Sequence, residues 1–122
     1  MLMSFSKLVP NVYYRDINDG IKFFVDCLGF RIGHQELNSK NPFCVIEREG
    51  LQMYMFQHEK LAKEHYPEFR LVTDIIDEVY KTISSAHPEF IHPNLSKVTL
   101  RPWGAKEFAL RDNQVCVIIQ QW

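Results

Sequence analysis

The stretch Arg101–Trp122 reads RPWGAKEFALRDNQVCVIIQQW, and its pattern decides the fold. A Pro-Trp-Gly corner precedes an alternating segment, Ala105–Arg111, then a polar turn, Asp112–Gln114, and a continuous apolar run, Val115–Ile119. This order predicts a β-hairpin. Trp103 stands between a proline that fixes φ and a glycine that relaxes it, so the hairpin presents an indole from a defined corner.

The composition is that of one globular domain. At 122 residues the chain can bury about two thirds of its unfolded surface, so no disulfide framework is required. The net charge of -1 gives no global field that would attract nucleic acid or an anionic membrane. No apolar run is long enough to span a bilayer. Cys27, Cys44 and Cys116 are scattered in apolar surroundings and no signal-peptide pattern is present, so we expect a cytoplasmic protein with reduced thiols.

The first half of the chain predicts a strand, a helix and three further strands. Leu8–Tyr14 is β-branched and aromatic, and Asp16 can cap a helix over about Ile17–Leu28, which Gly29 ends. Gly20 inside that helix costs about 1 kcal/mol relative to alanine. The predicted strands that follow are residues 30–36, 43–47 and 51–57, with a tight turn at Glu49–Gly50 before the last.

The opening pattern returns after a charged segment. Asp74-Ile75 repeats Asp16-Ile17 at an offset close to half the chain, which indicates an internal duplication. The second helix would be lined by Ile75, Val79 and Ile83 and would end or bend at His87-Pro88. A strand near residues 96–100 would precede the final hairpin.

These motifs resemble the glyoxalase/bleomycin resistance protein/extradiol dioxygenase superfamily, also called the vicinal oxygen chelate superfamily, and most closely its bleomycin resistance proteins. The matching residues of the terminal motif are Pro102-Trp103-Gly104, Glu107-Phe108 and Asp112, with Lys106 where arginine is usual. In the first half they are Pro10-Asn11, Arg15-Asp16, Phe23-Phe24 and Leu28-Gly29-Phe30.

The resemblance implies an α+β fold in which two βαβββ modules form curled mixed sheets around a cleft, with the helices outside. Residues 1–122 would form a single domain. Its first module would span about 7–58, a linker 59–67, and the second module about 68–122.

The resemblance also implies where a metal would bind. Enzymes of the superfamily hold a divalent metal with four inward side chains, whose positions fall here at Val9, Tyr54, Pro67 and Val117. None of these is a conventional ligand, and a register shift of one residue would offer only Glu68. The five histidines show no chelating spacing, although His58 and His65 bracket the linker and are worth checking. We therefore predict no metal and no cofactor.

No catalytic centre is indicated by the sequence. Metal-free catalysis needs a nucleophile beside a base, and no such combination is present. Cys27 and Cys116 lie in apolar patterns typical of packing residues, and the direction of Cys44 stays open. We predict no catalytic residue.

Strand alternation defines the expected binding surface. If Val9 and Tyr54 point inward, an aromatic and aliphatic set with a few amides faces the cleft. The predicted ligand-binding residues are Trp103, Tyr54, Phe56, Asn11, Tyr13, Phe69, Gln52 and Val117. Core packing is the alternative interpretation of each aromatic residue, because a cleft between sheets needs bulk to fill it.

Three functions are compatible with this pattern. The leading hypothesis follows what the resemblance to bleomycin resistance proteins implies. It is a metal-free homodimeric binding protein, with elements that could be swapped between subunits, which sequesters a flat aromatic or amphipathic molecule, such as an antibiotic, without turnover. The alternative is a metal-dependent lyase or dioxygenase of the same superfamily with displaced ligands. The third is an interaction module whose cleft is filled by its own side chains.

Overall fold

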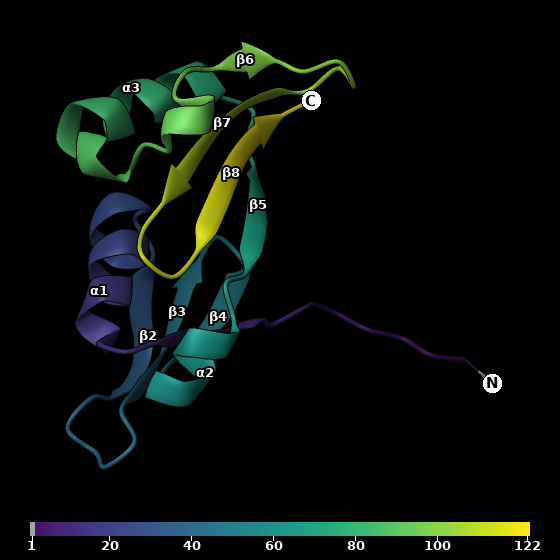
Figure 1. Cartoon of the computed structure of the whole chain (residues 1–122). Coiled ribbons are helices and arrows are strands. Elements are labelled where there is room, and N and C mark those ends of the chain that lie inside the picture. Colours follow the sequence, from purple (N-terminus) through teal and green to yellow (C-terminus); the bar gives the residue numbers. More distant parts are fainter. Residues whose placement is uncertain (1) are drawn as a thin grey trace. The chain divides into compact units, whose positions relative to one another are not determined.

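The computed structural model of the protein describes residues 2–122, which divide into two compact units at Leu61/Ala62 (Figure 1). Each unit contains a four-stranded mixed sheet with the same order of strands, β1-β4-β3-β2 in the first and β5-β8-β7-β6 in the second. In both sheets the first and last strands of the unit pair in parallel and the others pair antiparallel. The predicted α+β fold with two βαβββ units is confirmed.

The first unit follows the predicted order of elements. Its strands are β1 (Asn11–Tyr14), β2 (Arg31–Glu36), β3 (Phe43–Arg48) and β4 (Leu51–Gln57). The turn between β3 and β4 is the predicted one, since both Glu49 and Gly50 have positive φ, at 49° and 84°. Such a two-residue turn matches the twist of the strands it joins.

The helix of the first unit begins where the sequence predicts and changes its winding part-way. Helix α1 (Ile17–Ile21) is capped by Asp16, whose Oδ1 accepts the Asn18 N–H at 3.0 Å. A π-helix, η1 (Lys22–Cys27), continues it, and Gly29 ends it with φ +76°. The helical pattern did not indicate the π-helical turns.

Gly20 has a packing role in this helix. A Cβ atom at Gly20 would lie 2.5 Å from Met55 Sδ and 2.6 Å from the ring of Tyr14, closer than nonbonded atoms approach. The absence of a side chain therefore lets α1 lie directly against the sheet, which outweighs the helix-propensity cost of glycine. The core of this unit lies between the helix and that face of the sheet and includes Val12, Phe23, Phe24, Cys44 and Ile46.

The segment predicted as a linker contains a short helix, α2 (Glu59–Glu64). His58 precedes it, and His58 Nδ1 accepts the Leu61 N–H at 3.1 Å. This bond satisfies one of the amides that a helix start leaves without a partner. The sequence does not predict this helix, because its charged residues show no apolar stripe of helical spacing.

The second unit repeats the order of the first and has two 3-10 turns between its helix and its second strand. Its strands are β5 (Glu68–Val72), β6 (Thr99–Leu100), β7 (Lys106–Arg111) and β8 (Cys116–Gln121), and its helices are α3 (Ile76–Ala86) and the 3-10 turns η2 (Pro88–Phe90) and η3 (Pro93–Leu95). Helix α3 ends directly before His87-Pro88, as predicted. In Figure 1, α3 lies beside β7 and β8.

The start of α3 differs from the prediction made by analogy with Asp16. No side chain caps α3 at its N-cap residue, Ile75, and the predicted core residue Ile75 is exposed while Ile76 is buried. Gln121 Oε1 instead accepts the Ile76 N–H at 2.9 Å. Gln57 Oε1 accepts the Ile17 N–H at 3.0 Å in the same way. The last residue of the last strand thus ties down the helix in both units.

These glutamines identify which face of each sheet carries the helix. In β4, Gln57 and Met55 face α1, so Gln52, Tyr54 and Phe56 face away from it, as predicted. In β8, Gln121 faces α3, and by alternation so do Ile119 and Val117. We call the other side of each sheet the helix-free face.

Val117 and Phe69 therefore lie on the opposite face from the one predicted. Phe108, which pairs with Ile119, packs edge-on against Tyr80 of α3 at 5.0 Å, and Phe69 pairs with Val117. Both predicted site residues belong to the α3 side of the sheet. The error arose because the run Val115–Ile119 is apolar throughout, so its sequence carries no alternation from which to choose a face.

Candidate functional site

Four aromatic rings form a continuous row across the helix-free face of the first sheet. Tyr13 of β1 stacks on Phe56 of β4 with ring centroids 5.8 Å apart, and Phe56 stacks on Phe43 of β3 at 5.8 Å. The His34 ring of β2 follows at 5.8 Å from Phe43. We call these four residues the aromatic ladder. Phe56, Phe43 and Tyr13 are each partly exposed, so the ladder is a surface rather than a filled core.

Polar and aromatic neighbours flank the ladder. The ring of Tyr54 lies 6.1 Å from Phe56, and Asn11 Nδ2 donates to Tyr13 Oη at 3.4 Å. Gln52 shares the same face. Five of the predicted site residues are thus brought onto one face of one sheet, with amides and phenols at its margin.

The Pro-Trp-Gly corner forms a tight hairpin loop between β6 and β7. The Gly104 N–H donates to Arg101 O at 2.9 Å, and the Arg101 N–H donates to Ala105 O at 2.8 Å. Gly104 has φ +100°, the left-handed residue that a three-residue hairpin loop requires. Trp103 is 52% exposed at the tip of this loop, as predicted for a presented indole.

The indole of Trp103 is held by a chain of side chains on the helix-free face of the second sheet. Trp103 Nε1 donates to Glu107 Oε2 at 3.2 Å, and Gln120 Nε2 donates to the same oxygen at 2.7 Å. Trp122 Nε1 then donates to Gln120 Oε1 at 3.0 Å. Glu107 and Gln120 are 2% and 6% exposed, whereas Trp122 is 70% exposed. We call these four residues the indole network.

Arg101 lies against this network. Its Cζ lies 4.9 Å from the centroid of the Trp103 ring, which is within cation–π range, and its Nε lies 3.9 Å from Glu107 Oε1. Nε is buried and makes no hydrogen bond, while about a third of the side chain is exposed. The guanidinium therefore places a positive charge at the edge of the indole surface.

Sequence reasoning missed most of these partners. Phe43 and His34 could have been found from the pairing of alternating strands, since Phe43 lies directly opposite Phe56. Glu107 was matched to the terminal motif but not assigned to the site, because a carboxylate in a sequence is usually exposed, and Gln120 carried no signal. Trp122 was not placed in the site.

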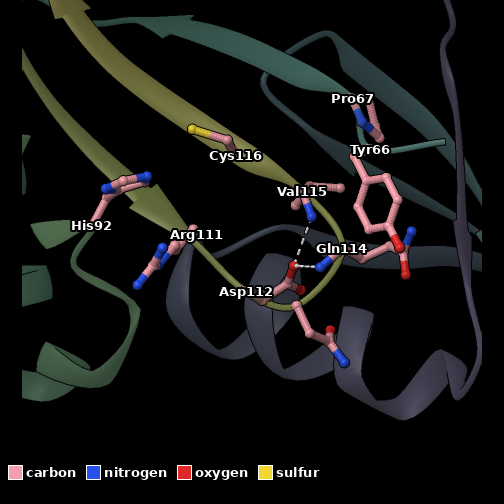
Figure 2. A pocket seen from close by; sticks show the side chains of 9 residues that line it. Tyr66, Pro67, His92, Arg111, Asp112, Gln114, Val115 and Cys116 are labelled. Carbon is pink, nitrogen blue, oxygen red and sulfur yellow. Dashed lines mark hydrogen bonds between the residues drawn. The ribbon is translucent and has the colours of Figure 1, made fainter. Parts of the chain in front are cut away.

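A separate hollow lies at the turn between β7 and β8 (Figure 2). Its volume is about 400 Å³, including space open to solvent, and it is lined by Tyr66, Pro67, His92, Arg111–Gln114, Val115 and Cys116. Asp112 Oδ1 accepts the N–H groups of Gln114 and Val115, each at 2.8 Å, and so builds the predicted polar turn. None of the predicted ligand-binding residues lines this hollow.

The thiol in this hollow is not activated. Burial raises the pKa of Cys116, the nearby Glu68 carboxylate raises it further, and Arg111 and Arg70 lower it by less. Since the thiolate is the nucleophile, a raised pKa makes the thiol less reactive at neutral pH. Burial likewise raises the pKa of Cys44, which lies inside the first unit. Both thiols are suited to packing, as the sequence indicates for Cys116; Cys44, whose direction the sequence left open, is fully buried.

The chain was compared with known proteins. No protein-family model and no curated protein sequence matches it. Among solved structures, a bleomycin-binding protein complexed with bleomycin is 22% identical, with 97% of this chain and 99% of that chain covered and a TM-score of 0.72. A bleomycin resistance determinant encoded on the transposon Tn5 is 23% identical, with 96% and 98% covered and a TM-score of 0.72.

This chain has the fold of the bleomycin-binding proteins. A member of the glyoxalase/bleomycin resistance protein/dioxygenase superfamily from Sphaerobacter thermophilus is also similar, at 20% identity, with 99% and 100% covered and a TM-score of 0.71. The predicted resemblance to this superfamily is confirmed at the level of the fold.

The metal positions implied by this superfamily do not suit a metal here. Gln57 and Gln121 are equivalent because each binds the first amide of its unit's helix, and Tyr54 and Ile118 lie three residues before them. Asn11 pairs with Tyr54 and Arg70 pairs with Ile118, so Val9 and Glu68, each two residues earlier, are equivalent as well. The second-unit metal positions are therefore Glu68 and Ile118, not Pro67 and Val117. Glu68 supplies the one carboxylate among them, and its Oε2 accepts from Arg70 Nη1 at 3.2 Å. Within residues 2–122, no group of three or more His, Cys, Asp or Glu is arranged to hold a metal ion. The side chains at these four positions do not form a set of donors suited to a divalent metal ion.

In the described residues, no helix combines the length and the apolarity needed to cross a bilayer.

Proposed function

We propose that this protein binds a flat aromatic or amphipathic small molecule and sequesters it without chemical turnover, with antibiotics among the candidate ligands. The aromatic ladder is the observation that carries the proposal. Its rings are partly exposed on the helix-free face of a sheet, where a soluble domain otherwise places polar side chains. A solved structure of the same fold is that of a bleomycin-binding protein complexed with bleomycin.

The chemistry of the ladder favours a planar ligand. Aromatic pairs contribute about 0.5–1.5 kcal/mol each beyond burial, and burial contributes about 25 cal/mol per Å². Two or three such contacts, with hydrogen bonds from Asn11, Gln52 or Tyr54, would hold a planar ligand against this face. The amides and phenols at the margin can orient polar groups on the ligand rim.

We propose that binding needs neither metal nor catalysis. The side chains at the implied metal positions are largely carbon, and the Cys116 thiol has a raised pKa. Elemental analysis of protein purified without chelator tests this point. Less than about 0.1 equivalent of Zn, Ni, Mn or Fe is expected, because a structural or catalytic site would be occupied stoichiometrically. Stoichiometric metal would favour the lyase or dioxygenase alternative.

We propose a homodimer as the working form, in the cytoplasm and without nucleic-acid or membrane partners. Leu2, Met3, Phe5 and Leu8 expose most of their apolar side chains in the segment before β1, which is a surface suited to a second subunit. Analytical ultracentrifugation is expected to give a mass near twice 14.5 kDa. A monomer at micromolar concentration would contradict this part of the proposal.

Titration calorimetry with a library of planar compounds tests the binding function. The variant Phe56→Ala removes the ring that contacts Tyr13, Phe43 and Tyr54, and is expected to weaken a library hit at least tenfold. Tyr66→Ala is the matched control, since it removes an exposed aromatic ring outside the ladder. Equal loss in both variants, or no hit in the library, would count against the proposal.

A further inference from the structure

The indole network contains more polar chemistry than its sheet needs. Phe56 in the first unit and Gln120 in the second occupy equivalent positions, because each directly precedes the glutamine that binds the helix. Phe56 pairs with Phe43 of β3, and Gln120 pairs with Glu107 of β7. The first unit is built with an aromatic pair at these two positions. A buried carboxylate is costly to place, so a carboxylate and an amide at the same positions require a reason beyond packing.

The hydrogen bonds of this polar pair supply the reason. Glu107 Oε2 accepts hydrogen bonds from two side chains, the Trp103 indole and the Gln120 amide. Gln120 in turn accepts a hydrogen bond from the Trp122 indole. Two exposed indoles are thus fixed by two buried polar groups. Indole rings held in this way keep little rotational freedom to lose when a ligand stacks on them.

We propose that the indole network is a preorganised platform for a planar aromatic anion, in which Glu107 and Gln120 act as positioning residues and Arg101 contacts the negative charge of the ligand. The proposal rests on the function proposed above and names the ligand class for one surface.

The charge preference follows from Arg101. The ring faces of an indole are electron-rich and would ordinarily attract a cation. Here the guanidinium of Arg101 already lies 4.9 Å from the centroid of the Trp103 ring, with about a third of its side chain exposed. The Glu107 carboxylate, which could attract a cation, is buried and accepts two hydrogen bonds. Glu107 Oε1 lies 3.9 Å from the buried Nε of Arg101, so the carboxylate faces the buried side of the guanidinium, and the exposed part of Arg101 is the charge that a ligand can reach.

The first experiment tests the network without any ligand. The indole signal of Trp122 is isolated in a Trp103→Phe background and followed by near-ultraviolet circular dichroism before and after Glu107→Gln. A weaker Trp122 signal is expected, because the charged oxygen that orients Gln120 is replaced by a neutral amide oxygen, whose hydrogen bond is about half as strong. Lys106→Gln in the same background is the control, since Lys106 is on the same strand and faces the other side. An unchanged Trp122 signal with Glu107→Gln would overturn the positioning role.

Folding is monitored in the same samples by far-ultraviolet circular dichroism. If Glu107→Gln fails to fold, two variants of Gln120 replace it. Gln120→Glu keeps the side-chain length and places two carboxyl groups at the pair. Gln120→Leu adds no charge and removes the hydrogen bonds of Gln120 to Glu107 and from Trp122. The network predicts that both variants alter the Trp103 signal in a Trp122→Phe background, although Trp103 does not touch Gln120 by a hydrogen bond. An unaltered Trp103 signal in a folded Gln120→Leu protein would contradict the coupling.

The second experiment tests the ligand class with two probes of similar shape, 2-naphthoate and 2-naphthylmethylammonium, titrated calorimetrically into the full-length protein. The anion is expected to bind about two- to fivefold more tightly than the cation, the ratio that one partly exposed ion pair supplies. Arg101→Met should abolish the preference, and Lys106→Met should retain it. Tighter binding of the cation would overturn the proposal.

The two proposals fail in distinguishable ways. If planar compounds bind and Phe56→Ala weakens them while Arg101→Met and Glu107→Gln do not, the binding function holds and the indole platform is wrong. If Trp122 responds to Glu107→Gln but neither naphthalene probe binds, the network is structural and the platform is again wrong. If the anion preference disappears in Arg101→Met but Phe56→Ala has no effect, the platform stands and the ladder is not the binding surface.

Discussion

Phe43 and Phe56 in the first unit occupy the positions that Glu107 and Gln120 occupy in the second. The strand order, the pairing and the helix-tying glutamine are the same in both units. One unit fills the two positions with stacked rings and the other with a carboxylate and an amide. The comparison teaches that the frame of the fold depends little on these side chains, so their chemistry is available for binding.

The helices show a second contrast between the units. Gly20 is the fourth residue of α1, and Val79 is the fourth residue of α3, so the two positions are equivalent. The first unit thus places its helix too close to the sheet for any side chain at this position, whereas the second leaves space for a valine.

The largest effect is expected from Gly20→Val, which gives the first unit the residue of the second. Its side chain would overlap Met55 Sδ and the Tyr14 ring, so α1 must move away from the sheet at a cost of about 3 kcal/mol in the free energy of unfolding. Urea denaturation checks the value. Asn18→Ala, at an exposed site in the same helix, is the control and should change stability by less than about 0.5 kcal/mol. A similar loss in both variants would show that close helix packing is not the cause.

A double-mutant cycle sharpens the comparison of the two pairs. Removing Glu107 and Gln120 singly and together is expected to give a coupling energy of about 2 kcal/mol, in the range for hydrogen bonds to charged groups. The same cycle on Phe43 and Phe56 should give about 1 kcal/mol, as for stacked aromatic pairs. Denaturant unfolding of the alanine variants measures both. A larger coupling between the phenylalanines would reverse the assignment of the polar pair as the stronger contact.

The order of elements could be predicted from the sequence because turn residues mark their ends. Gly29, Glu49-Gly50 and His87-Pro88 each stop an element where the structure ends it. The faces of β4 were also predictable, since Leu51, Met53 and Met55 recur at every second position and mark one face. The faces of β8 were not, because five successive apolar residues fit either register.

The part of the candidate site on the first sheet was predictable from strand alternation, and Trp103 from its corner between proline and glycine. Trp103 and Tyr54 stood out because large rings beside a turn or on an alternating strand need an explanation. Glu107 and Gln120 did not, because their burial comes from residues distant in sequence and their function from mutual hydrogen bonds. The role of Glu107 depends on its tertiary contacts, which the local sequence pattern does not indicate.

Two aspartates that look equivalent in sequence test how far the internal repeat extends. Asp16 accepts the Asn18 N–H at 3.0 Å and caps α1, whereas α3 begins one residue later and is held by Gln121. Asp16→Ala is therefore expected to cost about 1 kcal/mol. Asp74→Ala should change stability by less than about 0.5 kcal/mol. Thermal unfolding of both variants checks this difference, and an equal cost would mean that Asp74 caps α3 after all.

The smallest effect is expected at the cysteines, where the two units differ in access rather than in energy. Burial raises the pKa of Cys44 in the first unit and of Cys116 in the second, and only Cys116 is partly exposed. In a Cys27→Ser background at pH 8, iodoacetamide should modify Cys116 more slowly than a free thiol, and Cys44 only after unfolding. The rate at Cys116 should still rise with pH above the ordinary thiol value of about 8.5.

The charges around Cys116 give this prediction its sign. Glu68→Gln removes a carboxylate that raises the pKa of the thiol, so alkylation should become faster, while Arg111→Gln removes a cation that lowers it, so alkylation should become slower. Because the folded-state pKa is raised, the thiol's contribution to stability is fully present below the unfolded pKa and is lost as the pH rises through the folded one. Mass spectrometry of timed samples measures the rates. Equal rates in both variants would show that access, not charge, controls this thiol.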